Sequence, residues 1–142
     1  MEAQNYKNHG RMVPGFHFVT GGLMFLLLIG SIVNLVVSAH ANMYSASLIV
    51  LIAVVLNLLA FYARSFALKA QDRAIKAEEK LRYYILTGKP LIEGLSMRQI
   101  IGLRFASDEE YPALVEKALH DEMSEKEIKK NIKNWKPDHY RV

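Results

Sequence analysis

The sequence contains no cysteine at all, and over one long stretch it contains no charged residue. Without cysteine, no disulfide indicates the redox compartment and no thiolate nucleophile is available. Lys, Arg, Asp and Glu are all absent from residues 16–63. Glycine and proline are absent from residues 31–87, so a helix that begins near residue 44 can run unbroken to residue 87.

The uncharged stretch is long enough for two transmembrane helices, because each needs about 20 mostly apolar residues. The most polar break within it is "SAHANMYS" at residues 38–45. We therefore predict one helix at 16–39 and a second from residue 44 onward. A secretory signal peptide is the alternative for the first segment, since "AHA" at 39–41 fits a cleavage pattern. However, the apolar segment is far longer than the about 7–15 residues of a signal peptide.

The basic residues predict how such a hairpin is oriented. Lys7 and Arg11 precede the first helix, the remaining Lys and Arg follow the apolar stretch, and the connecting loop has none. Loops rich in Lys and Arg stay in the cytoplasm, so both termini are expected there. The net charge of +4 suits a surface near anionic lipid headgroups and does not require nucleic acid.

The second helix is expected to continue well beyond the membrane. A helix over residues 44–87 would be roughly 65 Å long, about twice the hydrocarbon core. The predicted fold is thus all-α, a membrane hairpin with a cytoplasmic helix extension and a small helical domain. Its segments are a lead-in at 1–15, the hairpin at 16–66, the extension at 67–87 and the C-terminal domain at 88–142.

The C-terminal domain carries recognisable helix signals. Gly88 followed by Pro90 is typical of a helix end. Three Ser residues are each followed three positions later by Glu or Gln, which is the capping-box pattern of a helix start. Pro112 is late for the second of these, so that helix is expected to begin nearer Tyr111. The three pairs are Ser96 with Gln99, Ser107 with Glu110, and Ser124 with Glu127.

Few residues have a pattern typical of catalysis or metal binding. His17 and His40 would lie about 34 Å apart along one helix, so they cannot share a haem within a chain. They are expected at the membrane interfaces. No cofactor, metal or catalytic residue is therefore predicted. The acidic run at 108–110 is interpreted as favourable charge at a helix N-terminus, with paired catalytic carboxylates as the alternative. "KEIKKNIKNWK" at 126–136 is interpreted as a helix with a solvated basic face, with a lipid or nucleic-acid surface as the alternative.

Small and polar residues mark candidate contact faces within the apolar helices. Gly30, Asn34 and Ser38 recur at intervals of four, which lets two membrane helices approach closely. Asn57 needs a partner in lipid, either from another chain or from its own helix carbonyl. A ten-residue stripe at spacings of three and four begins at Ala53 and continues to residue 84, as in a left-handed helix pair. Its predicted interface residues are Ala60, Ala63, Ala67, Ala70, Ala74 and Ala77. Helix propensity alone is the alternative explanation of the stripe.

The two ends of the chain resemble a known family. "QNYKNHGRMVPGFHFV" at the front and "LRFASDEEYPALVEKAL" with "EIKKNIKNWKPDHYRV" at the back are similar to a family of small, uncharacterised bacterial membrane proteins. That family is described only as a domain of unknown function. The resemblance implies a double-spanning protein of the bacterial inner membrane, and it implies no activity or site residues.

The predicted function is that of a non-enzymatic accessory or scaffold subunit in the membrane. It would associate through its small-residue faces with itself or with a larger membrane complex, with the lipid bilayer around it. Two alternatives remain open. One is a small membrane enzyme or cofactor-binding subunit that uses His17 or the acids at 108–110. The other is a tail that binds lipid headgroups or nucleic acid through residues 126–136, although nucleic acid is not expected.

Overall fold

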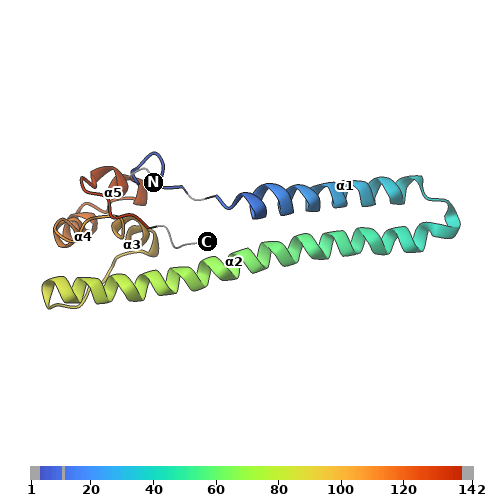
Figure 1. Ribbon diagram of the computed structural model, residues 1–142. Coiled ribbons are helices and arrows are strands. Elements are labelled where there is room, and N and C mark those ends of the chain that lie inside the picture. Colours follow the sequence, from blue (N-terminus) through green and yellow to red (C-terminus); the bar gives the residue numbers. More distant parts are fainter. Residues whose placement is uncertain (1–3, 11, 139–142) are drawn as a thin grey trace. The chain divides into compact units, whose positions relative to one another are not determined.

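A computed structural model describes residues 4–10 and 12–138, and these residues form helices joined by short connections (Figure 1). The described chain divides into two compact units. One comprises residues 12–67 and the other joins residues 4–10 to residues 68–138. In chain order the elements are the π-helix η1 (Gly15–Thr20), α1 (Gly21–Val37), the 3₁₀ turn η2 (His40–Asn42), α2 (Met43–Thr87), α3 (Met97–Leu103), α4 (Tyr111–His120) and α5 (Glu125–Asn131). The prediction of an all-α fold is confirmed at this level.

The first unit contains η1, α1 and the first half of α2. Ser38 and Ala39 adopt extended backbone, and the short turn η2 then leads into α2. The predicted break at 38–45 is therefore confirmed. The helical stretches Gly15–Val37 and His40–Thr87 are both long and apolar enough to cross a membrane.

Within this first unit, one face of each helix is shielded and the rest is open. Ser31, Ala46 and Ala53 are its buried residues, all with small side chains. Half-buried residues continue these rows at spacings of three and four, as expected where two helices lie side by side. The rows are Met24, Leu28, Ser31, Leu35 and Ser38 on α1, and Ala46, Val50, Ala53, Asn57, Ala60 and Arg64 on α2.

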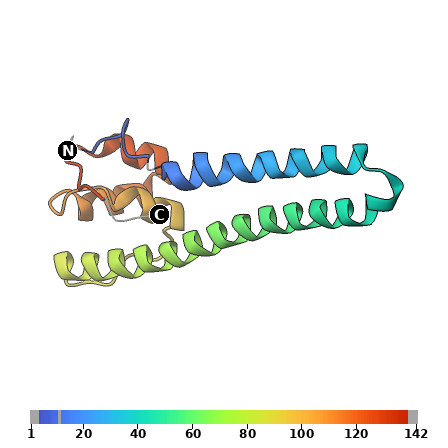
Figure 2. The same ribbon diagram turned by 45° about the vertical axis from the view of Figure 1, so that its right-hand side comes forward.

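Helix α2 is a single unbroken element of 45 residues, as predicted from the absence of glycine and proline (Figure 2). It ends where Gly88 takes a left-handed backbone conformation with φ +69°. The Gly88 N–H donates to the Tyr84 carbonyl oxygen at 2.8 Å, which closes the last turn. Glycine is preferred here because other residues are strained at positive φ.

The second unit has a hydrophobic core between the end of α2 and the three short helices. Ile75 and Tyr83 of α2 contribute to it, together with the fully buried Leu103, Phe105 and Tyr111. Helices α3 and α5 cross closely at Gly102, where a Cβ atom would lie 3.2 Å from a methyl group of Ile128. The unit therefore has its own tightly packed interior.

Two of the three predicted capping boxes are present. Ser96 and Ser124 each accept a hydrogen bond from the backbone N–H three residues later, and the Gln99 and Glu127 side chains bond back. The pattern at Ser107 does not start a helix, because α4 begins at Tyr111 as Pro112 suggested.

The N-terminal segment belongs to this second unit, although α1 and most of α2 separate it from the rest in sequence. The Asp138 backbone N–H donates to the Gln4 side-chain oxygen at 2.7 Å. His9 lies 3.2 Å from the Lys129 ammonium group and packs against the rings of Phe105 and Trp135. Residues near both ends of the chain are thus held in one folded unit.

Candidate functional site

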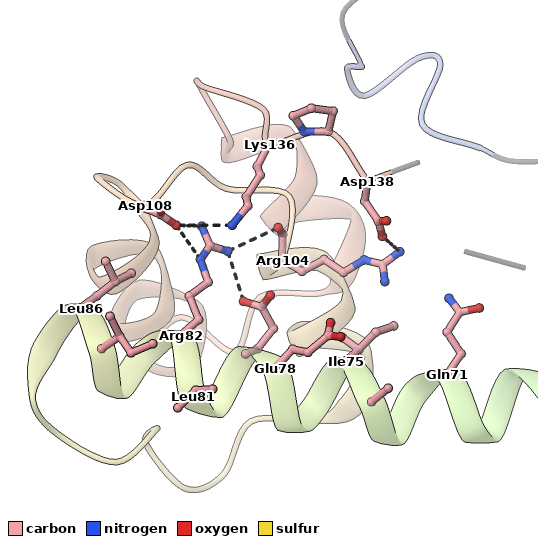
Figure 3. Close-up of a pocket in the computed structure, with 14 residues that line it drawn as sticks. Gln71, Ile75, Glu78, Leu81, Arg82, Leu86, Arg104, Asp108, Lys136 and Asp138 are labelled. Carbon is pink, nitrogen blue, oxygen red and sulfur yellow. Dashed lines mark hydrogen bonds and ion pairs between the residues drawn. The ribbon is translucent and has the colours of Figure 1, made fainter. Parts of the chain in front are cut away.

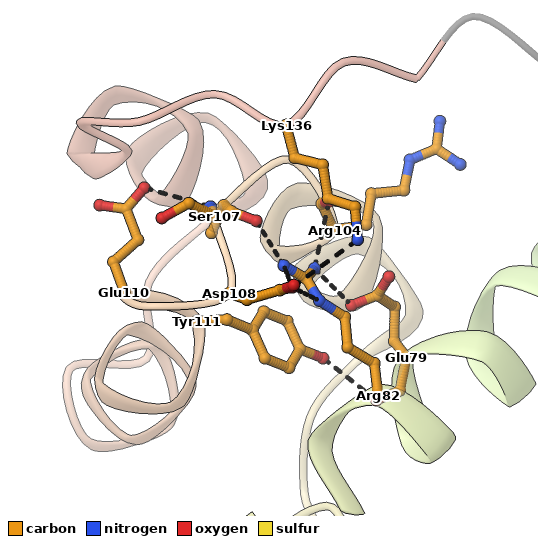
Figure 4. Close-up of polar contacts among 9 residues, drawn as sticks. Glu79, Arg82, Arg104, Ser107, Asp108, Glu110, Tyr111 and Lys136 are labelled. Atoms are coloured by element: carbon orange, nitrogen blue, oxygen red, sulfur yellow. Dashed lines mark hydrogen bonds and ion pairs between the residues drawn. The ribbon is translucent and has the colours of Figure 1, made fainter. Parts of the chain in front are cut away.

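The most connected polar side chain of the second unit is Arg82, on the face of α2 that packs against the short helices (Figure 4). Its Nε donates to Asp108 Oδ1 at 2.7 Å and its Nη1 to Glu79 Oε2 at 3.2 Å. Its Nη2 donates to the Ala106 carbonyl at 2.6 Å, and its guanidinium lies 4.2 Å above the centre of the Tyr111 ring. One side chain therefore joins α2 to the loop before α4.

Sequence spacing alone favours a different partner for Arg82. Glu78 lies four residues before it, which is the favoured acid-before-base spacing on an exposed helix. The structure instead pairs Arg82 with Glu79, three residues before it, and with Asp108. Packing of the loop over this face of α2, and not the local spacing, therefore determines the partners of Arg82.

The electrostatics of this network follow from Arg82 and from burial. The guanidinium of Arg82 lowers the pKa of the Asp108 carboxyl below its usual value, with a smaller contribution from Lys136, while partial desolvation opposes the shift. Burial raises the pKa of the Tyr111 hydroxyl, which donates to the Glu79 carbonyl oxygen at 3.3 Å. Near neutral pH the Asp108 carboxyl is therefore ionised and the Tyr111 hydroxyl is protonated.

Beside this network lies a cavity of about 910 Å³ (Figure 3). Its volume is within the range of about 300–1,000 Å³ typical of small-molecule sites. One wall consists of α2 and the other of the loops around Arg104 and Lys136. The lining residues are Gln71, Ala74, Ile75, Glu78, Glu79, Leu81, Arg82, Ile85, Leu86, Arg104, Asp108, Lys136, Pro137 and Asp138.

Arg104 is the cavity residue with an unsatisfied group. Its side chain is only 8% exposed, and its Nη2 pairs with Asp138 at 2.8 Å. Its buried Nε has no acceptor among the described residues. An unsatisfied buried donor costs about 1–3 kcal/mol, so an oxygen from water or from a bound molecule would be stabilised there.

The acidic run at 108–110 serves to hold loops together. Asp108 pairs with Arg82, and Glu110 accepts from the backbone N–H groups of Lys133 and Asn134. No acidic residue lies in the first turn of α4, which begins after the run. Glu110 is the N-cap residue of α4, so the run lies at the helix N-terminus as predicted, and its Asp108 and Glu110 carboxylates also bind different partners.

The histidines are dispersed in the described part of the chain. His17 is bonded to the backbone of Val13, His40 is exposed in η2, and His120 pairs with Asp121 at 2.8 Å. His139, which the sequence also offers, lies outside the described residues. Among residues 4–10 and 12–138, no three His, Asp or Glu side chains are grouped as metal ligands would be.

The basic segment at 126–136 is less helical and less exposed than predicted. Helix α5 ends at Asn131, and Trp135 forms an isolated β-bridge with Ala106. Lys129 is buried, 2.6 Å from Glu125 and above the Phe105 ring. The face predicted to be solvated therefore contributes a lysine to the interior of the unit.

The predicted small-residue row on α1 is largely open. Gly30 and Asn34 are exposed and Ser38 is half-buried. The Ser38 hydroxyl donates to the Asn34 carbonyl at 2.6 Å. The Asn57 amide donates to the Ala53 carbonyl at 2.8 Å, which is the own-helix alternative. A partner from a second chain for the other atoms of Asn57 stays a prediction.

The predicted alanine stripe divides between the two units. In the first unit Ala60 is half-buried, while Ala63 and Ala67 are exposed. In the second unit Ala70, Ala74 and Ala77 are also exposed, and Ala74 lines the cavity. Ala70, Ala74 and Ala77 thus lie on a side of α2 that the short helices leave exposed, and the interface predicted for the stripe stays a prediction.

Sequence reasoning missed the contributions of Glu79, Arg104 and Lys129. For Glu79 the one local signal was its position three residues before Arg82. Nothing local marks Arg104, because its partner lies 34 positions later in the chain, at Asp138. Long-range pairs of this kind depend on how the loops close over α2.

These observations define an all-helical protein with two helices apolar enough to cross a membrane and a folded second unit that contains a mixed-charge cavity. The chain belongs to a family of unknown function, DUF6526, whose family model matches residues 1–142. No curated protein and no solved structure matches the chain. The family resemblance expected from the two ends is thus confirmed.

Proposed function

We propose that the protein is a non-enzymatic accessory or scaffold subunit of the bacterial cytoplasmic membrane. In this proposal it spans the bilayer twice, keeps both termini in the cytoplasm, and associates with itself or with a larger membrane complex. The main supporting observation is the open apolar surface of residues 12–67, where burial is confined to three small residues. A surface of that kind needs lipid and neighbouring helices around it.

The packing of residues 4–10 is a second support. A chain that crosses a membrane twice has both ends on one side. Contacts of Gln4 and His9 with Asp138 and Lys129 support a topology in which the two flanks of the apolar region share a compartment. The basic residues on both flanks favour the cytoplasm as that compartment.

Topology can be tested directly because the chain has no cysteine of its own. Single cysteines at Asn42, in the loop, and at Lys126, on the exposed face of α5, provide one reporter for each side. In intact cells a membrane-impermeant thiol reagent should label Asn42→Cys and spare Lys126→Cys. The reverse labelling would overturn the orientation, and labelling of both sites after mild extraction is the control.

Association can be tested by gentle detergent extraction from the native membrane followed by mass spectrometry of the intact assembly. We expect a second copy of the chain, or another membrane protein, to remain bound. A monomer that carries only lipid would contradict the scaffold role.

The cavity supports a second candidate, a subunit that binds a small molecule. Its support is the unpaired Arg104 Nε beside an apolar wall of Ile75 and Leu81. Mass spectrometry of the same extract distinguishes the two candidates, because a bound small molecule lost on Arg104→Met would favour this one.

A further inference from the structure

The extension of α2 exposes an apolar row that is not covered by its own chain. This row, the open seam, consists of Ala70, Ala74, Ala77, Leu81 and Tyr84. All five are exposed, and the two large members carry most of the apolar area, with Leu81 60% and Tyr84 55% exposed. Large apolar side chains this exposed on a folded unit indicate a contact surface when they are contiguous.

The short helices pack on the opposite side of α2. The buried residues of that side are Ile75, Glu79 and Tyr83. Successive residues of an α-helix are about 100° apart, so the centre of this buried side lies roughly 180° from the centre of the open seam. The second unit can therefore fold completely and still leave the five seam residues exposed, with Ala74 and Leu81 also lining the open cavity on one side of the seam.

The charges beside the seam differ between its two edges. Arg73 and Lys80 lie on one edge, and Gln71 and Glu78 on the other. Arg73 and Glu78 have no ion-pair partner within the described chain, in contrast to Arg82 and Glu79 a few residues away. One edge thus has an unpaired positive charge at Arg73, and the other has an unpaired negative charge at Glu78.

The positions of these charges determine whether a partner helix lies parallel or antiparallel to α2. In a parallel, in-register pair of helices, a residue on one edge faces the residue five positions later on the other edge of its partner. Arg73 and Glu78 have that spacing, and the symmetry of the pair forms the contact twice. In an antiparallel pair each edge faces the same edge of the partner helix. Arg73 of one chain and Lys80 of the other would then repel each other.

We infer that the open seam binds the same seam of a second copy of this chain, with the two α2 extensions parallel and in register. This inference rests on the proposed function, because two copies inserted in one membrane with the same topology have parallel α2 helices. The alanines let the axes approach closely, and Leu81 and Tyr84 supply the buried area. The charges on the edges fix the direction.

The test exchanges the two charges in the full-length chain reconstituted in lipid. Arg73→Glu and Glu78→Arg alone should each weaken dimerisation by roughly 3- to 10-fold, because two attractive pairs become repulsive. The double variant, Arg73→Glu with Glu78→Arg, should return to within about 2-fold of the native chain. Energy transfer between labelled copies, measured over a range of protein-to-lipid ratios, reports the dissociation constant.

Two controls match these variants. Lys76→Glu makes the same change in net charge as Arg73→Glu but lies away from the seam, so it should leave dimerisation unchanged. Ala74→Cys should form a disulfide between copies, whereas Lys76→Cys should not.

The outcomes separate the inference from the proposed function. An oligomer that is insensitive to the charge exchange and is not crosslinked at Ala74→Cys overturns the inference and leaves a scaffold with another interface. A chain that stays monomeric in lipid and in the native extract overturns both. An assembly with a different protein alone overturns the inference and supports the accessory role.

Discussion

The two units of this chain use apolar residues in opposite ways. Residues 12–67 place most large apolar side chains on the outside and bury only Ser31, Ala46 and Ala53. The second unit encloses Leu103, Phe105 and Tyr111 completely. In water the first arrangement would be unstable and the second stable, because burial of apolar surface is the main driving force of folding. The stability of the second unit is therefore expected to depend on its own sequence, and that of the first on its surroundings.

The largest expected effect comes from a matched pair of leucines. Leu103→Ala should destabilise the second unit by about 4 kcal/mol, because it opens a cavity in a fully buried site. Leu26 on α1 is exposed within the chain, so Leu26→Ala should leave the unfolding free energy of the second unit unchanged. Urea unfolding of the full chain, followed by fluorescence of the single tryptophan, Trp135, measures both. Equal effects would mean that the two units do not differ in the way described.

Arginine provides the next comparison. Arg82→Met should cost about 3 kcal/mol, since it leaves the buried Glu79 carboxylate without its partner. Arg64→Met should have no effect on the same transition, because Arg64 belongs to the first unit, where its guanidinium lies 6.0 Å from the centre of the Phe16 ring. The same unfolding assay is suitable. If the Arg82 variant unfolded at the same urea concentration as the native chain, the network would not anchor the loop as described.

Glycine gives a smaller contrast. Gly102→Ala should destabilise by about 1–3 kcal/mol, because the new methyl group lies too close to Ile128 and to the Glu125 carbonyl. Gly22→Ala on α1 meets nothing within 4 Å and should be neutral or slightly stabilising through helix propensity. Thermal unfolding followed by circular dichroism measures the first, and the helix content of the reconstituted chain measures the second. A stable Gly102 variant would indicate that α3 and α5 can move apart.

The smallest effect is expected from protonation of a carboxylate side chain, which can occur only in the second unit because residues 12–67 contain no Asp or Glu. The pKa of Asp108 is lowered in the folded state, so its contribution is present above the unfolded value of 3.8 and is lost as the pH falls through the folded value. Asp108 is half exposed, so Asp108→Asn should cost less than about 1 kcal/mol at neutral pH. The difference in unfolding free energy between the variant and the native chain should shrink below pH 3.8. A constant difference would mean that the charge of Asp108 contributes nothing.

Much of the helical framework could be predicted from local patterns. The uncharged stretch indicated both apolar helices, and the missing glycine and proline indicated the length of α2. Gly88, Ser96 and Ser124 marked helix boundaries because their effect on the backbone is local. Ser107 failed as a start signal because Pro112 and the pairing of the loop with Asn134 delay the helix.

The cavity and its charges could not be predicted in this way. Arg82 selects Glu79 and Asp108 because a loop 26 positions away folds over α2, and no local spacing contains that information. Lys129 is buried because Glu125, His9 and the Phe105 ring surround its ammonium group. Packing of distant segments decided these contacts, whereas helix propensity decided the framework.

The contacts of residues 4–10 also determine when the second unit can be completed. Gln4 meets Asp138 across 134 positions of chain, and His9 meets Lys129 across 120. A ribosome releases residues 4–10 well before the α5 segment, so the early segment must wait until the residues as far as Asp138 have emerged. Contacts this distant in sequence close slowly. Synthesis of α1 and α2 therefore precedes closure of the unit, and its final docking can occur only in chains whose two ends have arrived in the same compartment.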